Sequence, residues 1–425
     1  MALLHPDEAL ALVEAVSLEP QTELVPLQGA LGRALAEEVL APEDSPPFPK
    51  AAMDGFAVSS ADPGPSWRLA ATLAAGDAPV RPLARGECAK IMTGAMLPPG
   101  ADRVIRVEYT REQGGTVQLL REETARNVIG RGENLRKGDP VLGPRLLGPQ
   151  DIGVLASLGM AEVKVAAVPE VGVLATGSEL RDPGESLAAG QIYNSNGLQT
   201  CAQVSASGGR PRYYGIVRDE PAVLRQAVDR ALDECDLILL SGGVSMGELD
   251  YVPAVLRECG AQILFHKMAI KPGKPTLFAR RERGEGPQLG GQGRQGGPPQ
   301  PGGSQLGGPP LQGPLPRPAV VFGLPGNPVS AFVIFEVFVR PLLYRLLGLR
   351  YQARTVRAQL AGTVRRRDAE RVELRPVRLQ DGQVRTLDYH GSSHLNALSG
   401  ADALLRLEAG VERLEEGSWV DVRLL

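Results

Sequence analysis

Between residues 171 and 347 the sequence alternates short apolar runs with segments of helical spacing. The apolar runs have the length of buried strands, and prolines and capping residues mark where helices begin. Strands that alternate with helices predict a parallel, doubly wound sheet, because each helix returns the chain to the same end of the sheet. The expected strands are Val171–Ala175, Tyr213–Val217, Asp236–Leu240, Ile263–Lys267, Pro275–Ala279 and Ala319–Phe322, and the expected helices are Asn196–Ser205, Glu220–Leu232, Tyr251–Glu258 and one from Asn327 towards Leu347.

The segments on either side of this α/β pattern have short β-like runs divided by Gly and Pro. They predict a β-rich module before the α/β part and a small β-barrel or sandwich after it. Residues 284–318 are rich in Gly and Pro, so we expect a disordered insertion there. The predicted domains are a discontinuous helical linker domain (1–48 and 141–167), a β-rich domain (49–140), an α/β domain (168–348) and a C-terminal β domain (349–425).

Composition excludes several classes of protein. The net charge of −3 argues against a nucleic-acid binder that relies on bulk positive charge, and 4% aromatic residues argue against a base-stacking platform. No apolar run reaches the length of a membrane span, and no basic leader opens the chain. The four cysteines form no C-x-x-C pair, so neither a thiolate zinc site nor a disulfide framework is indicated. We expect a soluble, cytoplasmic protein.

The lysines are unevenly distributed. Only seven of the 46 basic residues are Lys, and three of them, Lys267, Lys271 and Lys274, fall within eight residues. Pro272 and Pro275 stiffen this segment. Because an ammonium group is a compact charge suited to phosphates and other oxyanions, the cluster predicts an anion site.

Further polar and glycine residues follow the predicted strands. Glu179, Asp219 and Asp250 should meet at the carboxyl edge of the sheet, where three carboxylates beside phosphates suit Mg²⁺. Simpler interpretations stay open: Asp219 as a helix N-cap, Glu179 as a solvated acid and Asp250 as a helix-entry acid. The loops at this edge contain Gly242, Gly243 and Ser245, which suit close approach to a phosphate, and Pro325, Asn327 and Pro328, which also suit a tight turn before a helix.

Two segments of the β-rich module also stand out. Asp54 lies on a Gly turn between apolar residues, and Thr93 precedes Gly94 at the end of a predicted strand. On chemistry alone both are ordinary turns.

Taken in order, these segments resemble the MoeA-type molybdopterin molybdenumtransferases, a family that includes the C-terminal domain of gephyrin. The resemblance runs from about Asp7 to Leu425, apart from the Gly/Pro-rich insertion, and six ordered motifs are more specific than any one of them. The motifs are Met53-Asp54-Gly55-Phe56-Ala57-Val58, Ile91-Met92-Thr93-Gly94-Ala95 with Leu97–Asp102, Thr176-Gly177-Ser178-Glu179-Leu180, Ser241–Tyr251, Lys271-Pro272-Gly273-Lys274-Pro275 and Leu324-Pro325-Gly326-Asn327-Pro328-Val329-Ser330.

The resemblance implies the final step of molybdenum cofactor synthesis, in which adenylylated molybdopterin is cleaved, AMP leaves and molybdate is inserted. It implies an elongated homodimer with an active site between the α/β domain of one subunit and the β-rich module of the other. Molybdopterin adenylyltransferase and apo-molybdoenzymes are the further partners it suggests, and Mg²⁺ is the implied cofactor.

The family's functional positions carry over by motif. Lys267, Lys271 and Lys274 would neutralise the phosphates or molybdate. Asp54 and Thr93 would orient substrate from across the dimer. The metal ligands would be Asp219, Asp250 and Glu179, catalysis would involve Asp54, Thr93, Glu179, Asp219, Asp250, Lys267 and Lys271, and cofactor binding would involve Gly242, Gly243, Ser245, Lys274, Pro325, Asn327 and Pro328.

The sequence departs from the family in three places: Ser178 replaces an acid before Glu179, Pro49-Lys50-Ala51 replaces more polar residues, and 284–318 is inserted. Two alternatives stay open. One is a pterin adenylyltransferase, which shares the α/β domain but is normally a single small domain. The other is a non-catalytic, gephyrin-like scaffold, against which the retained lysines and carboxylates argue. The choice between molybdate and tungstate also stays open, because the two oxyanions have nearly the same size and charge.

Overall fold

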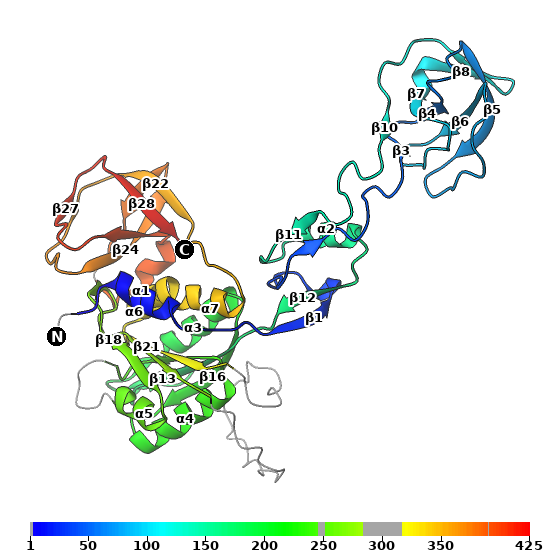
Figure 1. Ribbon diagram of the computed structural model, residues 1–425. Helices are drawn as coiled ribbons and strands as arrows, with labels where there is room; N and C mark the ends of the chain where they lie inside the picture. Colours follow the sequence, from blue (N-terminus) through cyan, green and yellow to red (C-terminus); the bar gives the residue numbers. More distant parts are fainter. Residues whose placement is uncertain (1–2, 245–250, 284–316, 390) are drawn as a thin grey trace, which may run out of the picture. The chain divides into compact units, whose positions relative to one another are not determined.

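The computed structural model describes residues 3–244, 251–283, 317–389 and 391–425 of the chain (Figure 1). The chain divides into two compact units. Unit 1 comprises Met1–Glu23, Gly32–Ala36 and Val165–Leu425, and unit 2 comprises Leu24–Leu31 and Glu37–Lys164. Among the described residues, no helix is long and apolar enough to cross a membrane.

A six-stranded sheet in the order β16-β13-β17-β21-β20-β18 forms the centre of unit 1. The strands β16, β13, β17 and β21 are parallel, as the alternating pattern predicts. The strands are β13 (Glu170–Thr176), β16 (Arg210–Val217), β17 (Leu237–Ser241), β18 (Gln262–His266), β20 (Leu277–Arg281) and β21 (Ala319–Leu324).

The predicted parallel arrangement does not extend to β20, which runs antiparallel to both β18 and β21. The physical reason is the connection before it. A parallel neighbour needs a long crossover, usually a helix. Between β18 and β20 the chain makes only a short reversal that contains the two-residue strand β19 (Ile270–Lys271).

Helices cover both faces of this sheet (Figure 1). Successive residues of β17 point to opposite faces: Leu237 and Leu239 pack with α3, α6 and α7, whereas Ile238 and Leu240 pack with α4 and α5. This two-sided burial confirms the doubly wound arrangement and holds the strand ends in fixed positions. The helices are α3 (Ser195–Ala206), α4 (Pro221–Glu234), α5 (Val252–Glu258), α6 (Pro328–Ile334) and α7 (Arg340–Leu346), and a π-helical segment, η3 (Phe335–Val339), joins α6 to α7.

The C-terminal strands of unit 1 form a closed barrel in the order β24-β25-β22-β28-β26, which the pairing of β24 with β26 completes. Of the two predicted architectures, barrel and sandwich, the structure has the barrel. The strands are β22 (Thr355–Leu360), β24 (Val372–Gln380), β25 (Gln383–Thr386), β26 (Ala403–Leu407) and β28 (Trp419–Leu424), with η4 (Leu395–Gly400) and the short pair β23 (Val364–Arg365) and β27 (Arg413–Leu414) beside them.

The N-terminal helix α1 (Pro6–Glu14) belongs to the same unit. Ala9 and Val13 pack into the cluster that covers one face of the central sheet. Proline in the first turn and a capping box at His5 fix its start. The short pair β14 (Leu180–Arg181) and β15 (Ile192–Tyr193) lies between β13 and α3 in sequence.

Unit 2 contains a six-stranded sheet in the order β7-β4-β6-β5-β9-β8. Its β-rich character is as predicted, and a 3-10 turn follows β7 directly. The sheet strands are β4 (Gly55–Val58), β5 (Ser66–Leu73), β6 (Glu87–Ile91), β7 (Arg103–Arg106), β8 (Thr110–Gln113) and β9 (Thr116–Leu119).

The remaining short elements lie in unit 2 or next to it along the sequence. The strands β1 and β12 cross from one unit to the other along the sequence. The elements are β1 (Thr22–Pro26), η1 (Leu27–Gly29), β2 (Val39–Leu40), β3 (Lys50–Ala51), η2 (Val107–Tyr109), β10 (Val128–Ile129), β11 (Pro140–Leu142), α2 (Pro149–Ser157) and β12 (Glu162–Ala166). The division of the chain into four domains stays a prediction.

Candidate functional site

A hollow of about 480 Å³ lies at the carboxyl edge of the central sheet. The ends of β13, β16, β17 and β21 all contribute to it, together with the first turn of α3. The predicted convergence of these four strand ends is therefore confirmed. The predicted residues that line this first hollow are Glu179, Asp219, Gly242, Gly243, Asn327 and Pro328.

Two glycines form the floor where β17 ends. Gly242 has φ +95°, and a side chain there would place its Cβ 2.4 Å from the carbonyl oxygen of Thr176. At Gly243, with φ +64°, the Cβ would lie 3.0 Å from the Thr176 hydroxyl oxygen. Only glycine allows this backbone to run so close to β13, which leaves room for a ligand above it. The Thr176 hydroxyl is buried and has no hydrogen-bond partner among the described residues.

The two carboxylates of this hollow are held differently. A carboxylate oxygen of Asp219 accepts a hydrogen bond from the backbone N–H of Ser178 at 3.0 Å. The interpretation of Asp219 as a helix cap is wrong, because the N-cap of α4 is Glu220 and it makes no side-chain capping bond. Asp219 instead ties the loop after β13 to the end of β16. Glu179 is exposed on that loop. Asp250 and Ser245 lie outside the described residues.

A second hollow, of about 660 Å³, adjoins the first and shares Glu179 and Asn327 with it. Lys271 and Lys274 line it, as does Pro325. The Lys271 side chain is 43% exposed, so its ammonium group is accessible to a ligand. Two of the three clustered lysines therefore reach one hollow.

Lys267 is not among the residues that line the two hollows. It adopts φ +80°, and its backbone N–H donates to the carbonyl of Thr276 at 2.8 Å. Lys267 is the first residue of the reversal between β18 and β20. Spacing in sequence cannot reveal this, because a residue's direction changes along a tight turn.

The second hollow also contains residues of the barrel that the sequence analysis missed. Arg371, Glu373 and Ser392 line it. Ser392 accepts a hydrogen bond from the Asn327 side chain at 2.7 Å. These positions had no local signal, because arginines are common throughout the chain and the polar stretch around Ser392 has no strand or helix pattern.

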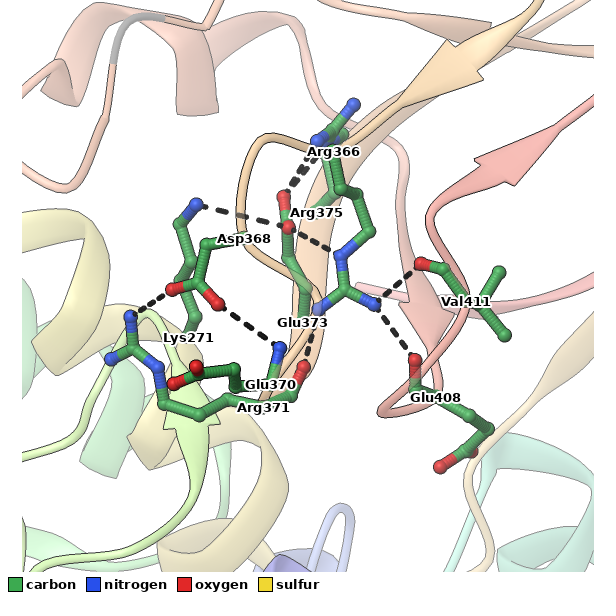
Figure 2. A network of polar contacts seen from close by, with 9 residues as sticks. All are labelled: Lys271, Arg366, Asp368, Glu370, Arg371, Glu373, Arg375, Glu408 and Val411. Carbon is green, nitrogen blue, oxygen red and sulfur yellow. Dashed lines mark hydrogen bonds and ion pairs between the residues drawn. The ribbon is translucent and has the colours of Figure 1, made fainter.

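Strand pairing places the barrel strand β24 next to Lys271. The strand β19 adds to β24 in parallel, with Ile270 opposite Val372 and Lys271 opposite Glu373. The Glu373 side chain is 4% exposed and is the centre of an ion-pair network (Figure 2). One carboxylate oxygen accepts from Arg375 at 2.7 Å, and the other accepts from Arg366 at 3.1 Å and lies 3.9 Å from the Lys271 ammonium nitrogen.

In unit 2, the two turns singled out in the sequence come together. The backbone N–H and the hydroxyl of Thr93 both donate to one carboxylate oxygen of Asp54, at 2.7 and 2.8 Å. These donations lower the pKa of Asp54, because they stabilise its charged form. Both side chains are exposed. The pair is therefore a preorganised carboxylate and hydroxyl on the surface of unit 2.

The donors around the first hollow fit a hard cation. No group of three or more His, Cys, Asp or Glu side chains with metal-binding geometry occurs in the described ranges, which omit Asp250. Mg²⁺ in phosphate-handling sites needs only one or two carboxylates, since water and substrate oxygens complete its shell. Glu179 and Asp219 on the same hollow supply that number.

Three family models match the chain. Residues 4–159 match the MoeA N-terminal region (domain I and II), residues 172–345 match a probable molybdopterin binding domain, and residues 357–425 match the MoeA C-terminal region (domain IV). The matches extend over both units and include every described residue of the two hollows.

Named relatives and solved structures agree with these models. A molybdopterin molybdenumtransferase of Bacillus subtilis is 30% identical over 99% of this chain and 93% of its own length. Another, from Haemophilus influenzae, is 36% identical over 79% of this chain and 76% of its own. A crystal structure of a molybdopterin biosynthesis MoeA protein from Pyrococcus horikoshii OT3 superposes with a TM-score of 0.79 at 28% identity, covering 100% of both chains. By sequence and by fold, the chain belongs to the MoeA family of molybdopterin molybdenumtransferases.

Proposed function

We propose that this protein inserts molybdate into adenylylated molybdopterin and releases AMP. The observation that carries the proposal is the pair of adjoining hollows, one with a glycine floor and two carboxylates, the other with two lysines and an arginine. The substrates are anionic, and the lysines and the arginine of the second hollow match their charge.

The second hollow supports binding of the oxyanions. Lys271 and Lys274 line it from the reversal after β18, and Arg371 lines it from the residue before β24. Molybdate and the phosphates of the adenylylated pterin are all acceptors of hydrogen bonds, and ammonium and guanidinium groups are their natural donors. These side chains would hold an oxyanion next to the first hollow and neutralise the charge that develops on the departing phosphate.

The first hollow supports binding of the phosphate link. The glycine backbone at Gly242 and Gly243 permits close approach, and Asn327 and Pro328 open α6 at the same edge. Mg²⁺ would be held by Glu179 and Asp219, with Asp250 as the further predicted ligand, and would supply polarisation of the phosphate oxygens. Asp219 also fixes the Glu179 loop through Ser178, so this part of the site is set before substrate arrives.

The wider setting of the reaction is also a proposal. The homodimer, the contribution of Asp54 and Thr93 to a partner's site, and the cytoplasmic location follow from family resemblance. The preorganised Asp54–Thr93 pair supports a substrate-orienting role, because an exposed charged group that is already hydrogen-bonded loses little entropy when it meets a ligand.

The decisive measurement is release of AMP from adenylylated molybdopterin with and without molybdate. The unaltered protein should release AMP in a molybdate-dependent manner, and Lys271→Ala should slow the release by about 100-fold, as loss of a charge-stabilising donor does. Lys164→Ala is the matched control, because Lys164 pairs with Glu37 in unit 2 and is not among the residues that line the two hollows.

The other candidate activities give different results in the same assay. Consumption of ATP with free molybdopterin would indicate a pterin adenylyltransferase. A scaffold would release no AMP, and its peptide binding would survive Lys271→Ala. Equal rates for the Lys271→Ala and Lys164→Ala proteins would remove Lys271 from the proposed reaction.

A further inference from the structure

Two cations that line the second hollow, Lys271 and Arg371, are already paired with acids of the same chain. We propose that Glu373 and Asp368 act as built-in counterions, which hold Lys271 and Arg371 in position and lower the affinity of the hollow for oxyanions. This inference rests on the proposed function and adds two affinity-determining residues to it.

Glu373 is placed opposite Lys271 by strand register rather than by chance contact. The separation of 3.9 Å between its carboxylate and the ammonium nitrogen is within ion-pair range but too long for a hydrogen bond. Lys271 is therefore attracted to Glu373 without being locked to it. An oxyanion in the hollow competes with the carboxylate for the same ammonium group.

The Glu373 carboxylate itself cannot move away. Arg375 donates to one oxygen from two nitrogens, at 2.9 and 2.7 Å, and Arg366 donates to the other. The Arg366 side chain is 1% exposed, and it also donates to the carbonyls of Glu408 and Val411 on a neighbouring turn. Figure 2 shows this anchoring on the side of Glu373 away from Lys271. The Glu373 carboxylate is thus fixed beside the hollow.

Arg371 has its own counterion. Its guanidinium donates to Asp368 at 2.9 Å, and Asp368 also accepts from the backbone N–H of Glu370. The hydrogen bonds from Arg371 and Glu370 hold the pKa of Asp368 below its ordinary value. The carbonyl of Arg371 accepts from Arg366, so the same buried arginine also fixes the connection between β23 and β24 that carries Asp368 and Arg371.

The consequence is electrostatic. Two lysines and an arginine without counterions would bind any phosphate strongly, including the leaving AMP, and tight ground-state binding does not speed a reaction. Two nearby negative charges weaken the attraction for every anion at the hollow. The acids therefore favour exchange of anions while keeping the donors in place.

The test is calorimetric binding of molybdate, and of inorganic sulfate, to the full-length protein at low ionic strength. Asp368→Asn removes a half-exposed charge and keeps the side-chain shape, so we expect the protein to fold and the dissociation constant of molybdate to fall about threefold. Glu373→Gln should lower it about tenfold, because the lost charge is buried beside Lys271. Both gains should shrink as salt is added.

Two control variants distinguish an electrostatic role of Glu373 from a purely structural one. Glu336→Gln removes another buried acid paired with an arginine, Arg340, and should lower the melting temperature without changing molybdate affinity. Glu415→Gln removes an exposed acid of the barrel that pairs with Arg413 and should change neither. A purely structural Glu373 would behave like Glu336.

Each outcome decides the inference. Tighter molybdate binding by Asp368→Asn and Glu373→Gln supports the inference, and unchanged or weaker binding overturns it. If Glu373→Gln does not fold, the Asp368→Asn result decides. Failure of the proposed function is distinguishable, because tighter binding without molybdate-dependent AMP release would keep the inference and reject the reaction. Absence of oxyanion binding in every variant would reject both.

Discussion

At the scale of single residues, Asp54 is a carboxylate whose protonation is controlled by one neighbour. Thr93 donates to it from the backbone and from the hydroxyl, and both bonds favour the charged form. The pKa of Asp54 is therefore lowered. The stabilisation from these bonds is present above the unfolded pKa of about 3.9 and is lost as the pH falls through the lower folded value.

Replacing the hydroxyl should shift this titration in a known direction. In Thr93→Val the backbone N–H still donates, but the hydroxyl bond is gone, so the pKa of Asp54 should rise part of the way to its ordinary value. Carbon-detected NMR titration of the Asp54 carboxyl measures this directly. Thr110→Val is the control, since that hydroxyl donates to the carbonyl of Val107. An unchanged Asp54 pKa in Thr93→Val would contradict the assignment.

Single residues also show what the sequence could and could not reveal. The lysine count identified Lys271 and Lys274, because three lysines in one short window are unusual in an arginine-rich chain. Arg371 and Glu373 could not be found in this way. Their importance depends on the pairing of β19 with β24, and a pairing across about 100 residues of sequence leaves no mark in either segment alone.

At the scale of elements, the end of β17 determines the shape of the first hollow. Gly242 follows this strand in a left-handed conformation and lies against the backbone of Thr176 at the end of β13. Two neighbouring parallel strands thus end in contact at the point where ligands enter such sheets.

A methyl group at Gly242 should be poorly tolerated. Gly242→Ala combines a strained φ with a Cβ 2.4 Å from a backbone oxygen, so we expect a loss of about 3 kcal/mol in the free energy of unfolding. Gly260→Ala is a matched control, because its φ of +79° is similar but no atom lies within 4 Å of the added Cβ. That variant should lose only about 1 kcal/mol.

Chemical denaturation of the two variants measures the difference. Equal losses would show that the close approach to Thr176 has no energetic effect. The comparison isolates the contact, because the conformational strain is common to both positions.

Elements were predictable where the chain is locally regular. The helices and strands between 171 and 347 follow from apolar spacing, proline positions and caps. The direction of β20 does not follow from apolar spacing, because the length of the connection before a strand decides its direction and the reversal at 267–276 is too short for a crossover helix. The π-helical segment between α6 and α7 was likewise hidden, since its residues have ordinary helical spacing.

At the scale of the whole molecule, each of the two units has apolar clusters of its own. In the described part of unit 2, the clusters around Ala57 and Phe56 are built from its own residues, and the clusters on the two faces of the central sheet belong to unit 1. Each core should therefore unfold as its own cooperative unit.

Buried thiols report on each core. Cys88 lies in unit 2 and Cys235 in unit 1; both are fully buried, and burial raises the pKa of each thiol to about 12. Neither should react with a thiol reagent in the native protein. Along a urea series, pulse labelling followed by mass spectrometry should give different midpoints for Cys88 and Cys235. Coincident midpoints, with Cys259 as a half-exposed reference that reacts throughout, would indicate a single cooperative unit.

The pairing of β19 with β24 also has a consequence for protein synthesis. Lys271 leaves the ribosome well before Val372 and Glu373, so the growing chain carries the ammonium group long before its partner strand exists. A nascent chain that stops short of the barrel would have a nearly complete α/β sheet and an unsupported lysine. Lys271 thereby gains both its counterion and the strand that positions it only when translation is almost finished.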